Sequence, residues 1–115
     1  MKKYPSKLVK IYKLMREMFP YGHPQFYWIV LELCQLHSNK SHDYGGATDP
    51  LYNLRQFGWK GVVVRLGDKF CRLKNFCEQA IFKVKNESVE DAFDDTAVYA
   101  ILGKILKQEE DNKNK

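Results

Sequence analysis

The chain has 115 residues, of which 44% are hydrophobic and 14% aromatic, and its formal net charge is +5. This length fits one domain with one hydrophobic core, and the longest apolar run, residues 26–31, is too short to cross a bilayer. Three cysteines without a CxxC spacing argue against a disulfide framework or a zinc site. With no signal-peptide pattern, they indicate a cytoplasmic protein whose cysteines are buried as small apolar side chains.

The first two predicted helices are separated by a turn rich in proline and glycine. Ser6 can cap a helix that runs to about Met18, with apolar residues mostly on one side and lysines opposite. A second helix runs from about Pro24 to Ser38. Because residues 26–31 are apolar on every side, we expect this helix to be central and buried.

A polar segment with two glycines follows. Residues 39–48 read as a loop of about ten residues, and loops of that length in compact domains are often functional. Asp49 and the proline after it read as an N-cap and the first residue of a short helix. Gly58 and Gly61 then bracket a connection to the next helix.

Two longer helices complete the predicted fold. One covers about residues 62–79 and carries an apolar stripe, and the last covers about 88–107. Residues 108–115 contain no apolar side chain and should be frayed. We therefore expect an all-α fold, a compact bundle of four to five helices, as a single domain over residues 1–107.

The last helix opens with an acidic cluster, residues 87–95. Ser88 and Asp91 have the spacing of a capping box, which explains the first acids without any function. Asp91 and Asp95 are four residues apart, so they are neighbours on one face and repel unless a cation lies between them. The alternatives are a metal ion, a basic side chain, or a solvated helix face.

The helix over residues 62–79 carries the opposite charge. Arg65, Lys69 and Arg72 surround Asp68. They read either as a surface ion pair, worth roughly a few tenths of a kcal/mol, or as phosphate ligands beside an acid that completes a metal site. In the preceding loop, Tyr44 either stacks on a base or packs the loop down.

Taken in chain order, four segments resemble a known family. They are residues 42–46 (HDYGG), 49–55 (DPLYNLR), 61–73 (GVVVRLGDKFCRL) and, in the last helix, 87–91 (ESVED) with Asp95 and 99–102 (YAIL). This set is similar to the nucleotide modification associated domain family, first type, which is common in phages and prophages. The resemblance covers residues 39–106 and implies a link to phage nucleotide metabolism. It implies a nucleotide-binding set of Asp43, Tyr44, Gly45, Asn53, Arg55, Arg65, Lys69 and Arg72.

A more distant similarity is to the MazG-like all-helical nucleotide pyrophosphohydrolases, which bind magnesium with acids from two helices. In this chain the first of their acid motifs is incomplete, because Glu32 stands with Gln35 in place of a second acid. The two resemblances together imply a Mg²⁺ site of Glu32, Glu87, Asp91 and Asp95, with Asp68, Asp91 and Asp95 as catalytic residues.

These observations leave three functions open. The first is a phage-type protein that binds a nucleotide or nucleotide-derived signal, with or without metal-dependent hydrolysis. The second is a non-catalytic protein that sequesters a host-defence signal, of cyclic nucleotide or ADP-ribose type, between subunits. The third, nucleic-acid binding through the lysine-rich first helix, is least favoured because the acidic helix would repel the backbone. We expect a homo-oligomer, because so small a domain buries a limited fraction of its surface, and no membrane partner.

Overall fold

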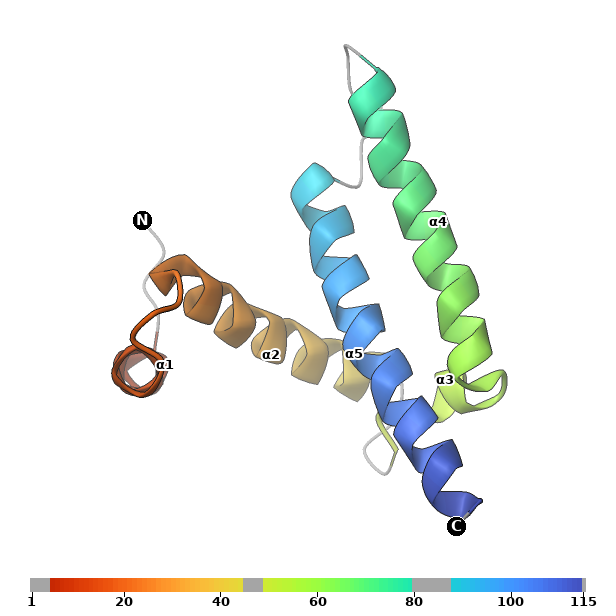
Figure 1. The fold of residues 1–115 in the computed structure, drawn as a ribbon, viewed down its shortest axis with the longest axis horizontal. Helices are drawn as coiled ribbons and strands as arrows, with labels where there is room; N and C mark the ends of the chain where they lie inside the picture. Colours follow the sequence, from red (N-terminus) through yellow and green to blue (C-terminus); the bar gives the residue numbers. More distant parts are fainter. Residues whose placement is uncertain (1–4, 45–48, 80–87, 115) are drawn as a thin grey trace. The chain divides into compact units, whose positions relative to one another are not determined.

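The computed structural model describes residues 5–44, 49–79 and 88–114, except for the side chains of residues 43 and 44. The described residues form five helices and no strand, which confirms the all-α class and the predicted number of helices (Figure 1). The helices are α1 (Ser6–Met18), α2 (Pro24–Tyr44), α3 (Tyr52–Arg55), α4 (Gly58–Glu78) and α5 (Val89–Lys113). The chain divides into two units, Met1–Lys40 and Ser41–Lys115.

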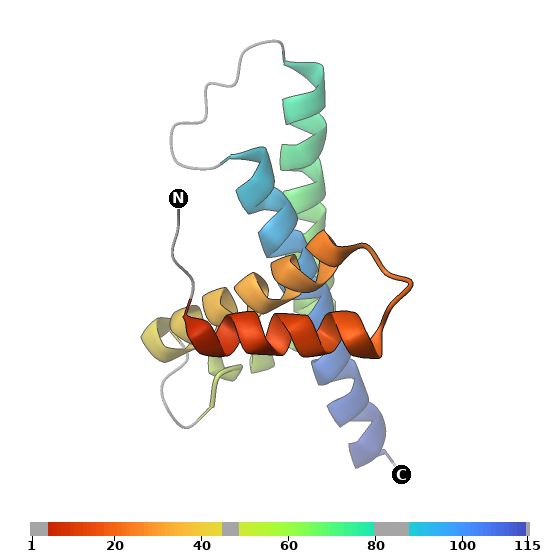
Figure 2. The same ribbon diagram turned by 90° about the vertical axis from the view of Figure 1, so that its left-hand side faces the viewer.

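In the first unit, α1 and the start of α2 are joined by the turn at residues 19–23 (Figure 2). Aromatic rings hold the two helices together. Tyr12 meets Trp28 edge to face with ring centroids 5.0 Å apart, and Phe19 lies beside Tyr27 at 6.1 Å. Aromatic pairs at these separations add to the free energy gained by burying the rings.

Ser6 does not cap α1 as the sequence suggested. Pro5 is the N-cap residue, and Ser6 is already the first helical residue. Proline is compatible with this place because the amides at the start of a helix have no partner within the helix.

The prediction that α2 is buried on all sides is wrong. Tyr27 and Leu31 are buried, but Phe26 is 64% exposed and Ile29 is 42% exposed. Within this unit α1 can cover only one side of α2, so its other apolar residues lie at the surface. All three cysteines are also exposed, contrary to expectation.

The predicted loop at residues 39–48 is also largely wrong. The helix α2 continues through Tyr44, so the histidine and tyrosine of the HDYGG segment lie on helical backbone. No proline or glycine occurs from residue 25 to residue 44, and the next glycine along the chain is Gly45. Polar residues alone do not end a helix, because their intrinsic cost is small compared with that of glycine or proline.

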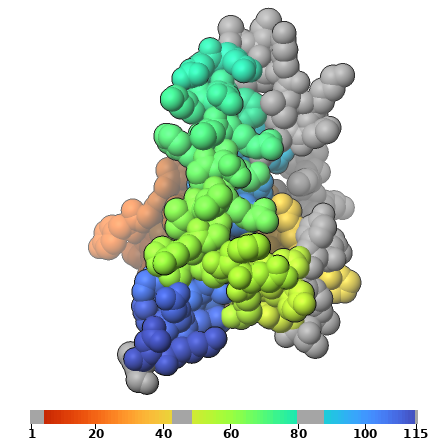
Figure 3. Space-filling model, turned by 90° about the vertical axis from the view of Figure 1, so that its right-hand side faces the viewer, coloured from red at the N-terminus to blue at the C-terminus, as the bar shows by residue number. Residues whose placement is uncertain are grey.

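The second unit is built on an antiparallel pair, α4 and α5, which lie side by side, with the short α3 packed beside the start of α4 (Figures 1 and 3). Leu51, Val62, Leu102 and Leu106 form its buried core. The last two are four residues apart and so lie on one face of α5, which is the periodicity that a packed helix needs.

Two glycines at the start of α4 have different roles. Gly58 has φ of +65°, the only positive φ in the described chain, and allows the sharp turn from α3 into α4. Gly61 lies inside the helix, contrary to prediction, and a Cβ at this position would come within 2.5 Å of the Phe57 Cβ. Gly61 is therefore a close-packing residue and does not belong to a connection.

The last helix is longer than predicted and includes most of the expected tail. It ends at Lys113, and two ion pairs secure its final turns: Arg55 with Glu109 and Lys107 with Asp111. None of the described helices combines the length and apolarity needed to cross a membrane.

Candidate functional site

Two of the predicted site residues, far apart in sequence, meet between α4 and α5. The Lys69 Nζ lies 2.9 Å from an Asp95 carboxylate oxygen. Both side chains are partly shielded, with exposed fractions of 18% and 22%. An ion pair shielded to this degree is screened less by salt than a pair at the open surface. Of the three alternatives left open for Asp95, a basic side chain is therefore present, and it is Lys69.

This ion pair fixes which residues of α4 lie near which residues of α5. A second contact sets the same register, because a Cβ on Gly103 would lie 3.1 Å from Val62 Cγ1. Lys69 follows Val62 by seven residues, and Gly103 follows Asp95 by eight. The two contacts are therefore nearly equally spaced along both antiparallel helices, and they agree on one register. In this register Arg72, three residues beyond Lys69, is level with residues 92–93 of α5.

The basic residues of α4 form a row along one side of the helix. Arg65, Lys69 and Arg72 have the spacing i, i+4 and i+7, which places them on one face. By spacing, Arg65 and Arg72 lie on the side of α4 that carries Lys69, and Asp91 lies one turn from Asp95 on α5. We call the group Arg65, Lys69, Arg72, Asp91 and Asp95 the α4–α5 polar seam. Asp68 is exposed on α4.

Asp91 has a structural partner as well as a possible ligand role. Its backbone amide donates to the Ser88 Oγ at 3.0 Å, and its carboxylate accepts from the Ser88 amide at 3.2 Å. This is the predicted capping box, and it is confirmed. A capping residue contributes about 1 kcal/mol to helix stability, so the first acid of the pair is explained without a ligand.

The proposed magnesium ligands are only partly described. Within residues 5–44, 49–79 and 88–114 no group of three His, Cys, Asp or Glu side chains could hold a metal ion. Glu87 lies outside the described residues, and Glu32 is a half-buried residue of α2 in the first unit. Asp91 and Asp95 are the two ligands that remain, and each has the protein partner given above.

Arg55, predicted to bind nucleotide, is bound by two carboxylates. Its Nε lies 2.8 Å from Asp49, and its two terminal nitrogens contact Glu109 of α5, one of them at 3.3 Å. The Arg55 guanidinium lowers the pKa of Glu109. The hydrogen bond from Arg55 also lowers the pKa of Asp49, and a second hydrogen bond, from the Leu51 amide, lowers it further. The same carboxylates raise the pKa of Arg55. In this arrangement Arg55 ties α3 to the end of α5.

The remaining predicted ligands are not gathered at the polar seam by any described contact. Asn53 is exposed on α3. Asp43 and Tyr44 belong to the last turn of α2, and their side chains lie outside the described residues, as does all of Gly45.

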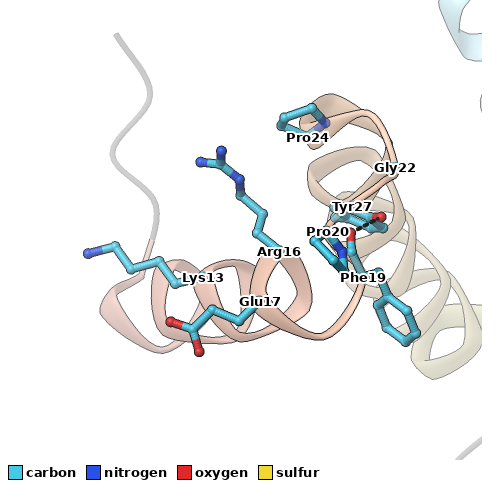
Figure 4. Close-up of a pocket in the computed structure, with 8 residues that line it drawn as sticks. All are labelled: Lys13, Arg16, Glu17, Phe19, Pro20, Gly22, Pro24 and Tyr27. Carbon is cyan, nitrogen blue, oxygen red and sulfur yellow. Dashed lines mark hydrogen bonds between the residues drawn. The ribbon is translucent and has the colours of Figure 1, made fainter.

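The structure also contains a pocket that the sequence analysis did not identify. It has a volume of about 460 Å³ and lies between the end of α1, the turn and the start of α2 (Figure 4). Its charged lining comes from Lys13, Arg16 and Glu17, and its apolar lining includes Pro20 and Tyr27. The signal in the sequence was the run of basic residues leading into a turn with two prolines, which we read only as a charged face and a break.

The chain was compared with protein-family models, with curated proteins and with solved structures. None of the three comparisons finds a match.

Proposed function

We propose that this protein binds a nucleotide or nucleotide-derived small molecule and holds it without turnover, using the α4–α5 polar seam. The observation that supports this most is the shielded Lys69–Asp95 pair. It holds the basic row of α4 in a fixed register with α5, so the cations are oriented before a ligand arrives. Preorganised groups lose less entropy on binding than flexible ones.

In this proposal the two arginines of the row supply most of the phosphate recognition. Arg65 and Arg72 lie one turn to either side of Lys69. A guanidinium donates two parallel hydrogen bonds to phosphate oxygens, which a lysine cannot do. Lys69 neutralises Asp95, so that this carboxylate does not repel the phosphate.

The partners of the acids favour binding over metal-dependent hydrolysis. Asp91 holds the capping box and Asp95 holds Lys69, so a magnesium ion would have to displace one or both contacts. Magnesium requires near-octahedral oxygen ligation, and two displaced carboxylates supply only part of it. The proposal therefore needs no metal. Mg²⁺ binding would require Glu87 as a further ligand beside Asp91 and Asp95.

The resemblance to a phage family suggests what such binding would do in the cell. A small phage protein that holds a nucleotide signal tightly would keep it from a host-defence effector. We propose that several copies of the chain assemble, that Tyr44 covers the base, and that the ligand is released intact.

The decisive experiment is native mass spectrometry of the protein as purified from cells, followed by heating and analysis of the released small molecules. We expect a homo-oligomer carrying a phosphate-bearing, ultraviolet-absorbing ligand that is recovered unchanged. A ligand recovered as a cleaved product would contradict binding without turnover. Retention of the ligand only in the presence of Mg²⁺, with loss in EDTA, would favour the metal-dependent alternative.

A pair of matched variants tests the site itself. Arg72→Gln should weaken retention of the ligand by at least about tenfold, since a charge-assisted hydrogen bond contributes about 1.5–3 kcal/mol. Lys74→Gln removes the same charge from an exposed residue of α4 on a different face, and should leave retention unchanged. Equal losses in the two variants would show that only net charge matters, and would reject the polar seam as the site.

A further inference from the structure

The pocket between α1 and α2 has one wall whose shape is fixed by close packing. A Cβ on Gly22 would lie 1.9 Å from the Tyr27 hydroxyl oxygen, so only glycine allows the turn to approach Tyr27 so closely. The Tyr27 hydroxyl donates to the Phe19 carbonyl oxygen at 2.6 Å, and Tyr27 is only 7% exposed. Pro20 and Pro24 restrict the backbone on either side. The wall is therefore formed before any ligand binds.

The opposite side of the pocket carries two cations that have no carboxylate partner in the part of the chain that the structure describes. Among the described residues neither Lys13 nor Arg16 forms an ion pair, whereas Arg55, Lys69 and Lys107 all do. The Arg16 guanidinium lies 5.7 Å from the centre of the Tyr12 ring, a cation–π contact that positions it without neutralising it. Figure 4 shows Arg16 extending from α1 toward Pro24.

The third charged residue restricts the ligand further. Glu17 also lines the pocket, one residue beyond Arg16. Its carboxylate repels a bare anion but accepts a hydrogen bond from a hydroxyl or amino group. The volume of about 460 Å³ lies within the range of small-molecule sites, and it exceeds what a phosphate ion alone would fill.

We propose that this pocket binds a phosphomonoester that also bears an aromatic ring, as a nucleoside monophosphate does, with its phosphate between Lys13 and Arg16 and its ring against Pro20, Pro24 and Tyr27. A phosphomonoester dianion matches the charge of Lys13 and Arg16, and a ring fills the apolar remainder. Glu17 accepts from a hydroxyl or amino group of the same ligand. This site uses residues 13–27 alone, so it stands independently of the α4–α5 polar seam.

The test is a titration of the full-length ¹⁵N-labelled protein with adenosine monophosphate, followed by amide NMR shifts. Adenosine supplies the ring without the phosphate, and inorganic phosphate supplies the charge without the ring. We expect saturable shifts at the amides of Arg16, Glu17 and Gly22 with adenosine monophosphate, and at least about tenfold weaker binding of each fragment. Absence of saturation at these amides at millimolar concentration would overturn the proposal.

Variants on α1 distinguish binding at a specific site from general attraction to the positive charge of the helix. Arg16→Gln should weaken binding of adenosine monophosphate by about tenfold, while Lys10→Gln, which removes an exposed cation outside the pocket, should change it less than about twofold. Equal weakening by both variants would overturn the proposal. Glu17→Gln should tighten binding of inorganic phosphate, and unchanged or weaker binding would also count against it.

The same spectra distinguish this proposal from the proposed function. Shifts confined to residues 65–72 and 91–95 would support binding at the polar seam and overturn binding in the pocket. Shifts confined to residues 13–27 would support the pocket and show that the polar seam does not bind adenosine monophosphate. The dispersion of the Arg16→Gln spectrum reports directly whether that variant is folded.

Discussion

The register of α4 against α5 underlies the polar seam, and the contact between Val62 and Gly103 allows it to be tested by a double-mutant cycle. Val62 is 1% exposed, and the Val62→Ala change removes two buried methyl groups. At about 0.8 kcal/mol each plus a cavity contribution, the cost should be roughly 2–3 kcal/mol.

The effect of Gly103→Ala should depend on which residue occupies position 62. Alanine gains about 1 kcal/mol of helix propensity over glycine, but here its Cβ would meet Val62 Cγ1 at 3.1 Å. Overpacking of a buried contact costs about 1–3 kcal/mol, so we expect Gly103→Ala to destabilise the natural protein by roughly 0–2 kcal/mol. In the Val62→Ala background the nearest remaining atom is the Cβ of residue 62, 3.6 Å away, which is an ordinary contact. There Gly103→Ala should stabilise by about 1 kcal/mol.

The measurement is urea unfolding at one protein concentration, followed by circular dichroism at 222 nm. Gly67→Ala is the matched control, because Gly67 lies within α4 and a Cβ there meets no atom within 4 Å. It should stabilise by about 1 kcal/mol whichever residue occupies position 62. If Gly103→Ala has the same effect in the natural protein and in the Val62→Ala variant, within about 0.5 kcal/mol, the helices do not pack in this register and the polar seam is wrongly assembled.

Three further predictions follow from individual contacts. A double-mutant cycle with Lys69→Met and Asp95→Asn should give a coupling of about 1 kcal/mol that declines with added salt, and a coupling near zero would show that the pair contributes nothing. Ser88→Ala should lower the free energy of unfolding by about 1 kcal/mol, whereas Ser88→Asn should largely preserve it, both measured by urea unfolding. Arg55 lowers the folded-state pKa of its two carboxylate partners, so their contribution to stability is present above the ordinary carboxyl pKa and is lost as the pH falls through the lowered values. Arg55→Met should therefore flatten the acid limb of the stability–pH curve, and an unchanged limb would contradict the assignment.

Several parts of this fold could be read from the sequence because they depend on neighbouring residues. The helical periodicity of α4 and α5 identified both helices, and Ser88 with Asp91 identified the start of α5. A capping box closes within four residues, so it forms wherever the chain is helical. Helix ends marked only by polar residues were missed at Tyr44 and Lys113, because such residues weaken a helix without stopping it.

The sequence also located the charged residues of the polar seam without showing how they pair. Arg65, Lys69 and Arg72 were candidates for phosphate, and a metal ion, a basic side chain or solvent were the alternatives beside Asp95. The resemblance also implied Arg55 as a nucleotide ligand, yet its guanidinium is bound by Asp49 and Glu109.

The sequence by itself determined that this protein is all-α, where most of its helices lie, and how charge is distributed along them. Only the tertiary structure decided that Lys69 faces Asp95, that Arg55 holds the end of α5, and that Arg16 and Tyr27 line one pocket. The reason is physical. Periodicity and capping depend on residues within about one turn, whereas contacts between helices depend on the crossing and register of whole elements, which side chains such as Val62 and Gly103 set by their shape.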